Sequence, residues 1–162
     1  MKNSFIDIHS KGGYPSSALS NFAKHKFTVD GIRCGSMEGF LQSLKYKNRL
    51  LARSVAKKSG KRAKRAGDRR KGWRRRGVLY WKGKKYERLS PALSALIRRA
   101  YEAMFRESSD FRAALGASMG YTLTHSLGKS DPFDTVLTEG EFIGHLNHLR
   151  RNCLSAKVKE TK

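Results

Sequence analysis

The sequence predicts a single α+β domain that is mostly helical and carries a few short strands and hairpins. Apolar residues recur at helical spacing in several separate stretches, and β-prone runs flank two glycine-containing turns. The 162 residues suffice for one hydrophobic core but not for two. We therefore expect one domain over residues 1–153, followed by a polar, flexible C-terminal tail over residues 154–162.

The charge balance excludes most small-metabolite enzymes and favours a polyanionic partner. Lys and Arg number 35 against 13 Asp and Glu, which gives a formal net charge of +22. Such a field attracts polyanions and speeds their encounter, so nucleic acid is the leading partner and an anionic membrane surface the second.

Cysteine usage and the N-terminus point to a soluble cytoplasmic protein. Cys34 and Cys153 are too few and too isolated for a disulfide framework or a zinc site. Residues 1–8 lack the apolar run of a signal peptide, and no stretch is long enough to span a membrane.

The N-terminal third predicts a strand, a loop and a hairpin. Residues 4–8 alternate apolar and polar side chains, as a short strand does, and the Gly, Pro and Ser residues of 12–17 predict a loop. Asp30-Gly31 then separates two β-prone runs within residues 27–34, which is typical of a tight type I′ hairpin.

The next stretch, Ser36 to Tyr46, predicts a core helix with one acid at its start. Ser36 is a candidate N-cap, which places Glu38 in the first turn, where the helix dipole favours an ionised carboxylate. The apolar stripe that we expect to be buried is listed as Met37, Phe40, Leu41, Leu44 and Leu51.

Residues 57–85, called the basic segment below, hold most of the charge. They contain fifteen Lys or Arg residues and one acid, Asp68, and their glycines prevent a long helix. A solvated loop is one interpretation of such a charge block. Interleaved Trp and Tyr residues favour an ordered segment instead, with a second hairpin turning at Gly83.

The C-terminal half predicts three helices and a loop. Ser90-Pro91 begins a helix with a buried stripe from Leu93 to Met104, and a short helix follows, introduced by Ser109-Asp110 and ending at Gly116. Residues 119–134 show no clear period and predict loop. The capping box over residues 138–141 starts the last core helix.

Few acids are available for chemistry in so basic a chain. Glu38 lies near the core, and Asp131 and Asp134 lie in a loop shortly after His125. Two carboxylates from distant parts of a chain are what glycosidic hydrolysis uses, one beside the sugar and one managing the proton of the leaving group. The plainer alternative is that Glu38 forms an ion pair and the two Asp residues cap turns.

Two ordered sets of residues resemble the YbiA/NADAR family of N-glycosidases. The first set is Leu19-Ser20-Asn21-Phe22 followed by Ser36-x-Glu38-x-x-x-Gln42-x-x-Lys45-Tyr46, and the second runs from Ile97 to Asp131. The resemblance implies a YbiA-like domain that cleaves the bond between a base and ribose. It also implies catalytic roles for Asn21, Glu38 and Lys45, with Asp131 as the second carboxylate.

The chain departs from the family pattern in places that affect the substrate. Asp131 precedes Pro132-Phe133-Asp134, where the family has a Trp-Gly pair, and His125 stands where an acid is often found. The tryptophan of the family corresponds to Trp73 or Trp81. We expect the substrate to be contacted by a further set of side chains: Ser20, Phe22, Trp73, Trp81, His125 and Asp134.

A family that cleaves base–sugar bonds, combined with a basic surface, predicts a DNA glycosylase that leaves an abasic site. The enzyme would flip out a modified base, with Trp73, Trp81 or a Tyr stacking on it or filling its place, and would use no cofactor or metal. Such a role resembles that of bacterial glycosylases that attack phage DNA carrying modified cytosines. The side chains expected to hold DNA phosphates are Arg62, Lys64, Arg65, Arg69, Arg70, Lys71, Arg74, Arg75, Arg76, Lys82, Lys84 and Lys85.

Two other functions fit the same residues. An ADP-ribosyl-guanine hydrolase acting on DNA would share the site but cleave a different bond. A nucleic-acid-binding protein could have kept the fold and lost catalysis.

Overall fold

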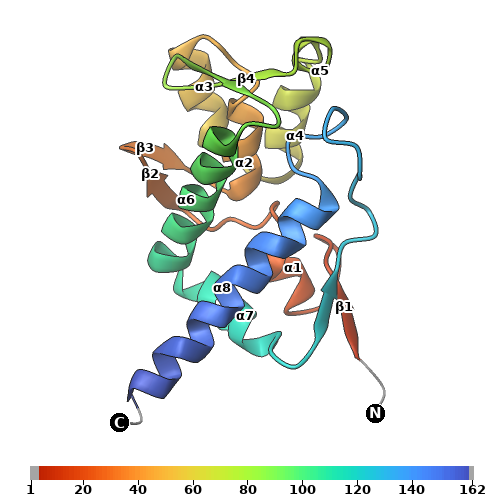
Figure 1. Cartoon of the computed structure of the whole chain (residues 1–162), viewed down its shortest axis with the longest axis vertical. Helices are drawn as coiled ribbons and strands as arrows, with labels where there is room; N and C mark the ends of the chain where they lie inside the picture. Colours follow the sequence, from red (N-terminus) through yellow and green to blue (C-terminus); the bar gives the residue numbers. More distant parts are fainter. Residues whose placement is uncertain (1–3, 161–162) are drawn as a thin grey trace.

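Eight helices and six short strands make up residues 4–160, which the computed structural model describes, with side chains through residue 153. The arrangement is α+β with helices predominating, which confirms the predicted fold class. The basic segment and its neighbour α3 (Arg49–Ala56) lie at one end of the molecule, and β1 (Phe5–Asp7) and the end of α8 (Glu139–Glu160) lie at the opposite end (Figure 1).

Strand β1 (Phe5–Asp7) pairs in parallel with β6 (Thr122–Thr124). Residues 119–134, which the sequence predicts to be mostly loop, therefore contain one short strand. Three residues carry no readable period, and this strand forms because β1, more than a hundred positions earlier, supplies its hydrogen-bonding partner.

The two predicted hairpins are confirmed. Strand β2 (Phe27–Val29) pairs with β3 (Ile32–Cys34), and β4 (Val78–Trp81) pairs with β5 (Lys84–Glu87). Both two-residue turns, Asp30-Gly31 and Lys82-Gly83, have positive φ angles throughout. This backbone is the type I′ turn, whose twist matches that of antiparallel strands.

Helix α2 (Met37–Ser43) begins where its cap predicts, because Ser36 Oγ accepts the N–H of Gly39 at 2.9 Å. The helix is shorter than expected. A second helix, α3 (Arg49–Ala56), starts after Asn48, whose side chain accepts the N–H of Leu51. Leu51 is therefore not part of the buried stripe: it belongs to α3 and is 47% exposed.

The basic segment forms two further helices, α4 (Gly60–Asp68) and α5 (Gly72–Arg76), before the β4–β5 hairpin. Its small residues Ala63, Ala66 and Gly67 are buried, while its Lys and Arg side chains face outward. The segment is ordered because it is amphipathic: its apolar side chains are buried and its charged side chains are exposed to solvent.

The remaining helices are α1 (Ser16–Leu19), α6 (Pro91–Glu107), α7 (Ser109–Ala117) and α8 (Glu139–Glu160). Helix α6 has the predicted Ser90 cap and the predicted stripe, and the capping box at α8 is formed in both directions between Thr138 and Glu141. Helix α8 runs on through residues 154–160 of the predicted tail; residues 161–162 lie outside the described part of the chain.

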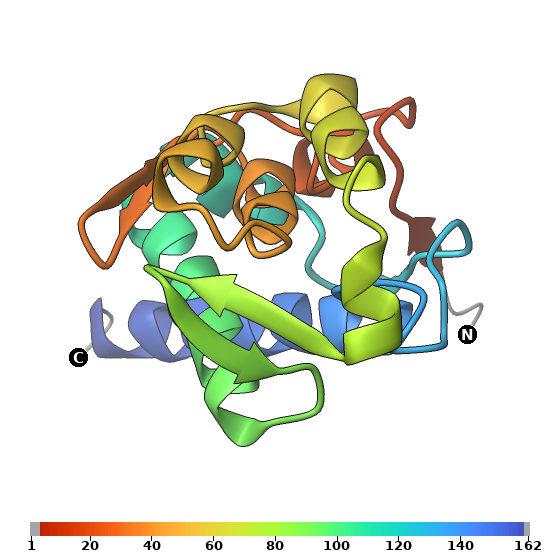
Figure 2. The same cartoon turned by 90° about the horizontal axis from the view of Figure 1, so that it is seen from above.

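The core lies between α2, α6 and α8, with the hairpins and α7 closing its sides (Figure 2). Phe40 of α2 is fully buried and meets the edge of Trp81 at 5.1 Å between ring centroids. Helix α2 is therefore covered on its apolar face and leaves its opposite face for the site described below. None of the helices within residues 4–160 is both long enough and apolar enough to cross a membrane.

Gly39 lets α2 approach the end of α3, since a Cβ on it would collide with the carbonyl oxygens of Ala56 and Lys58. We expect Gly39→Ala to lower the free energy of unfolding by about 1–3 kcal/mol, because backbone atoms cannot move aside. Gly144→Ala in α8, where a Cβ meets open space, should leave stability unchanged or raise it by up to about 1 kcal/mol. Urea denaturation measures both, and equal effects would contradict this packing.

Candidate active site

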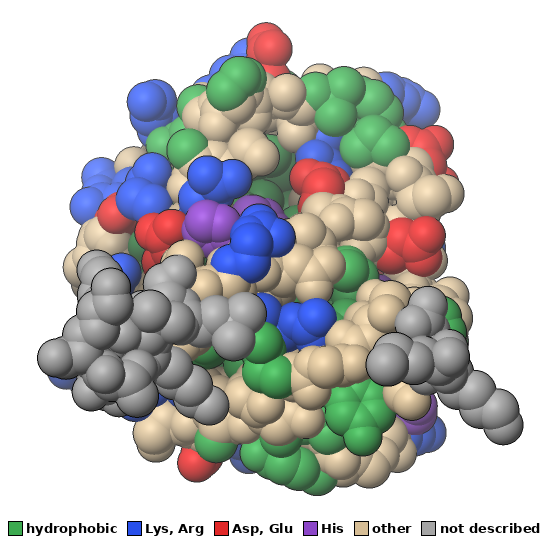
Figure 3. All heavy atoms as spheres, turned by 60° about the horizontal axis from the view of Figure 1, so that its bottom comes forward, with side chains coloured by type: hydrophobic (Ala, Val, Ile, Leu, Met, Phe, Trp, Pro, Cys, Tyr) green, Lys and Arg blue, Asp and Glu red, His purple; other side chains and the backbone are tan. Residues whose placement is uncertain are grey.

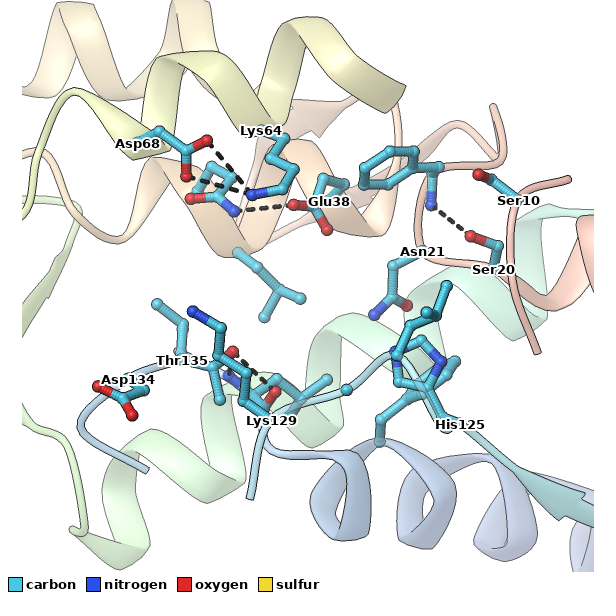
Figure 4. A pocket seen from close by; sticks show the side chains of 18 of the residues that line it. Ser10, Ser20, Asn21, Glu38, Lys64, Asp68, His125, Lys129, Asp134 and Thr135 are labelled. Atoms are coloured by element: carbon cyan, nitrogen blue, oxygen red, sulfur yellow. Dashed lines mark hydrogen bonds and ion pairs between the residues drawn. The ribbon is translucent and has the colours of Figure 1, made fainter. Parts of the chain in front are cut away.

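A pocket of about 350 Å³ opens between two walls that come from distant parts of the chain. One wall is formed by residues 20–22, α2 and α4, and the other by the loops 125–129 and 134–137 (Figure 4). Of the residues predicted from the sequence, the pocket is lined by Ser20, Asn21, Phe22, Glu38, Lys45, Lys64, Arg74, His125 and Asp134.

Glu38 is held at the start of α2 by two hydrogen bonds. Its backbone N–H donates to the carbonyl oxygen of Asn21 at 3.0 Å, and its Oε1 accepts the side-chain N–H of Gln42 at 2.8 Å. Its other carboxyl oxygen faces the pocket (Figure 4). One oxygen is thus fixed by protein and the other is directed toward a ligand.

Burial raises the pKa of the Glu38 carboxyl above its usual value, although Gln42, Lys45 and Lys64 act in the opposite direction. Burial thus acts against the helix dipole, which the sequence predicted to favour the ionised form. The free-energy cost of removing a carboxylate from water is larger than the stabilisation that the dipole of one short helix provides. A raised pKa suits a group that exchanges a proton near neutral pH.

Asn21 is fixed from behind by Tyr101, a fully buried residue of α6. The Tyr101 hydroxyl donates to Asn21 Oδ1 at 2.7 Å, and Tyr101 itself stacks on His145 at 4.8 Å. With its oxygen engaged, the Asn21 amide directs its nitrogen into the pocket (Figure 4). The side chain is therefore a positioned hydrogen-bond donor beside Glu38.

Lys45 lies just beyond α2, and burial lowers its pKa to about 8, against the pull of the Glu38 charge. Its ammonium lies over the ring of Trp73, 5.7 Å from the centroid. Lys45 also lines a second cavity on its other side. A cation at this boundary can contact a ligand that occupies either space.

The opposite wall is a loop pinned at several points. His125 Nδ1 donates to the carbonyl oxygen of Ile8 at 2.7 Å, since a carbonyl can only accept. Ser126 N–H donates to Asp7 Oδ1, and Gly128 N–H to the carbonyl of His125. These bonds leave His125 Nε2 as the ring atom free to act as an acceptor while the ring is neutral.

Asp131, the predicted second carboxylate, is not brought into the pocket. It is exposed, and its Oδ1 accepts the backbone N–H of Phe133 at 2.8 Å, which makes it a turn-capping residue. Asp134 is among the residues that line the pocket, and it lies at the edge of the second wall beside Thr135 (Figure 4). Of the two acids predicted in this loop, only Asp134 therefore reaches the pocket.

The two tryptophans are also elsewhere. Trp81 is 5% exposed and donates its Nε1–H to Asp30, so it is a core residue that cannot stack on a base. Trp73 is 2% exposed and lines the second cavity, not the pocket. Burying the apolar area of these two rings stabilises the fold, so neither ring is exposed to a ligand. The expectation that Trp73 or Trp81 stacks on a flipped base is therefore wrong.

Several residues of the site received no role from the sequence. Gln42 belongs to the motif of residues 36–46, and its position four residues after Glu38 could have indicated their contact on one helix face. Asp68, paired with Lys64 at 3.3 Å, and the loop residues Leu127 and Lys129 carry no such signal. Tyr101 is 80 positions from Asn21, and only the fold joins them.

The other predicted DNA contacts divide into three places. Arg62 and Arg65 project from α4, Lys82, Lys84 and Lys85 lie on the β4–β5 hairpin, and the remainder surround the second cavity or α5. The face turned forward in Figure 3, nearer the opposite end, mixes acidic, basic and apolar side chains. The charge is thus concentrated at the end that holds the basic segment.

The pocket shows no built metal centre. Within the described residues, no group of three or more His, Cys, Asp or Glu side chains is placed to hold a metal ion.

Two sequence comparisons relate this chain to bacteriophage proteins. The profile of the family described as Bacteriophage protein GP30.3 matches residues 13–151. A 17.1 kDa protein encoded in the Gp30-rIII intergenic region of Enterobacteria phage T4 is 43% identical over 146 residues, which cover 90% of this chain and 96% of that protein. Both matches span all residues of the pocket's first wall.

The fold is similar to that of the E. coli protein YbiA, solved by NMR. The TM-score is 0.64 at 19% sequence identity, and the match covers 98% of this chain and 89% of YbiA. This likeness confirms the YbiA-like fold that the ordered motif of residues 19–46 implied.

The raised pKa of Glu38 predicts a stability cost at neutral pH. An acid whose pKa is higher in the folded state stabilises the fold below its ordinary value of 4.5, and this contribution is lost as pH rises through the folded value. Glu38→Gln should therefore have little effect on unfolding near pH 4 and should stabilise the protein at pH 7, as measured by urea denaturation at the two pH values.

Glu141 provides the control of opposite sign. Burial acts to raise its pKa, but hydrogen bonds from Arg88 and Thr138 outweigh burial and lower it. Glu141→Gln should destabilise at pH 7 by up to about 3 kcal/mol, because it leaves the buried Arg88 guanidinium without its anion. A Glu38→Gln protein that is destabilised at pH 7 would contradict the raised pKa.

Proposed function

The chain belongs to the bacteriophage GP30.3 family, and from the chemistry of its pocket we propose that it is an N-glycosidase that hydrolyses a base–sugar bond. The observation that carries this proposal is the Asn21–Glu38 unit. Glu38, whose carboxyl has a raised pKa, donates its backbone N–H to the carbonyl oxygen of Asn21. The side-chain amide of Asn21 is fixed as a hydrogen-bond donor in the same pocket. The YbiA-like fold supports the same reaction class.

Hydrolysis replaces the C1′–N bond with a C1′–O bond from water, and the proton released by water ends on the departing base. The sugar passes through an oxocarbenium-like state, as in other glycosidic cleavages. Glu38 exchanges the proton, since its pKa lies nearer neutrality than that of a solvated carboxyl. Asn21 orients the sugar by donating to one of its oxygens, and Asp134 on the facing wall stabilises the positive charge that develops.

The substrate is a base in nucleic acid, and DNA is the form we propose. The support is the +22 charge and its concentration around the pocket, where Lys64 and Arg74 line the mouth and further cations adjoin them. Because the family and the T4 relative are described as bacteriophage proteins, an anti-phage role has no support, and we limit the proposal to a glycosylase acting on a modified base.

Leu127 replaces the tryptophans as the group that assists base extrusion. It lines the pocket yet is 74% exposed, and the loop that carries it is pinned through Ser126 and Gly128. An apolar side chain held rigidly at the mouth of a pocket can fill the space that a flipped base leaves in a duplex.

A second candidate function is ADP-ribosyl-guanine hydrolase acting on DNA. It uses the same Asn21–Glu38 unit, and the cations that would hold backbone phosphates would hold a diphosphate equally well. A catalytically inactive nucleic-acid-binding protein is the third, and it predicts binding without any product.

Three DNA substrates distinguish these functions: unmodified DNA, DNA with glucosylated hydroxymethylcytosine, and ADP-ribosylated DNA. Incubation followed by alkali should break strands at the modified cytosine, whereas released ADP-ribose with an intact strand supports the hydrolase. Glu38→Gln should lower turnover by about 10²–10⁴-fold and keep DNA affinity. Turnover that survives this substitution, with Asp131→Asn as the control outside the pocket, would exclude Glu38 as the catalytic acid.

Leu127 is tested by base extrusion, independently of which base is cleaved. Binding to a duplex that contains 2-aminopurine should raise its fluorescence, and Leu127→Ala should reduce this rise by about tenfold while single-strand affinity stays unchanged. Leu50→Ala is the matched control, since Leu50 of α3 is equally exposed and does not line the pocket. Equal fluorescence in all three proteins would remove Leu127 from the mechanism.

A further inference from the structure

A second cavity, of about 780 Å³, adjoins the candidate active site and is formed largely by the basic segment. Its walls are residues 45–48, which follow α2, and residues 69–73 with Arg76 and Tyr80. Lys45 lines both cavities, so the two spaces meet at this side chain. The basic segment thus forms a concave site, not only a charged surface.

All charged residues that line the cavity are cations. The lining contains no carboxylate, and its cations are Lys45, Lys47, Arg69, Arg70, Lys71 and Arg76. Of the ion pairs that the structure shows among described residues, none involves these six side chains. Six like charges around one concave space repel one another, and a bound anion would offset that repulsion.

One cation of the cavity is held in position by a neighbouring ring. The Arg70 guanidinium lies over the ring of Tyr46, 4.8 Å from the centroid, and the Tyr46 hydroxyl is itself fixed by donating to the carbonyl of Ala66 at 2.7 Å. A positioned guanidinium is the group best suited to phosphate.

We propose that this cavity binds the phosphate groups of the substrate, next to the nucleoside that occupies the pocket. The chemistry recognised is a phosphate ester, from either an internal phosphodiester of a strand or a terminal phosphate of a nucleotide. Lys45 contacts both the phosphate and the nucleoside. A phosphate beside its ammonium also offsets the free-energy cost of burying that positive charge. Phosphate binding in this cavity does not require catalysis, but the alignment with a nucleoside rests on the proposed function.

The test compares two double variants that remove the same charge. Arg70→Gln/Arg76→Gln lies in the cavity, and Lys84→Gln/Lys85→Gln lies on the exposed β4–β5 hairpin outside it. The probe is a fluorescein-labelled single-stranded oligonucleotide without a terminal phosphate, measured by anisotropy over a salt series. Thermal unfolding checks that both variants are folded.

The cavity variant should bind about tenfold or more weakly and lower the salt slope by about two, whereas the hairpin variant should bind within about threefold of the parent. Equal losses of oligonucleotide affinity in the two variants would mean that the overall positive charge of the protein, and not this cavity, attracts the strand. That result would overturn the proposal. So would an unchanged affinity of the cavity variant for both this oligonucleotide and the ligand below.

A deoxynucleoside 5′-monophosphate, with inorganic phosphate as competitor, distinguishes the two sources. Cavity-dependent binding of the oligonucleotide alone assigns the site to internal phosphodiesters. Cavity-dependent binding of the monophosphate, displaced by inorganic phosphate, assigns it to a terminal phosphate. Either result supports the cavity even if the three-substrate assay yields no product, so failure of the proposed function and failure of the phosphate site are separable.

Discussion

The burial of one carboxyl group at the start of α2 is the constraint on which the site depends. Glu38 can lie there because Asn21 accepts its N–H and Gln42 donates to its side chain. Gly39 and Gly67 let neighbouring backbone and the Gln42 amide come close enough to maintain that arrangement. The cost of desolvating the carboxyl is retained as a raised pKa, a property that suits the proton exchange proposed for this group.

The basic segment resolves a conflict between charge and folding. Its cations repel one another, yet Ala63, Ala66 and Trp73 anchor it to the core, and the turn at Lys82-Gly83 folds its end back on itself. Burial of these apolar groups fixes where the charges stand. The result is a set of cations beside the pocket, with the hairpin lysines held apart from them.

The facing wall is assembled by contacts of long sequence separation. The parallel pairing of β1 with β6 brings Ile8 to His125 and Asp7 to Ser126. These contacts fix the position of the loop that bears Leu127. Backbone hydrogen bonds then lead the chain to Asp134. The pocket is therefore built by one rigid helical wall and one loop wall that the short sheet holds in place.

The sequence by itself determined the elements whose signals are local. Type I′ turns need residues that tolerate positive φ, and helix caps need Ser, Asn or Thr at the helix start. Buried stripes need helical spacing. Both hairpins, the starts of α2, α6 and α8, and the buried stripes of these helices were therefore predicted, apart from Leu51. The motif around Glu38 also identified most of the first wall, because those residues lie within a short stretch of chain.

Only the tertiary structure decided which side chains face the same space. Asp131 and Asp134 are chemically alike and three residues apart, and a turn that uses Asp131 as its cap directs Asp134 to the pocket. Trp73 and Trp81 suit a stacking role by type, but the gain from burying them places both in walls of the fold. The pKa of Glu38 likewise depended on its surroundings, since burial raises it although the helix start favours the charged form.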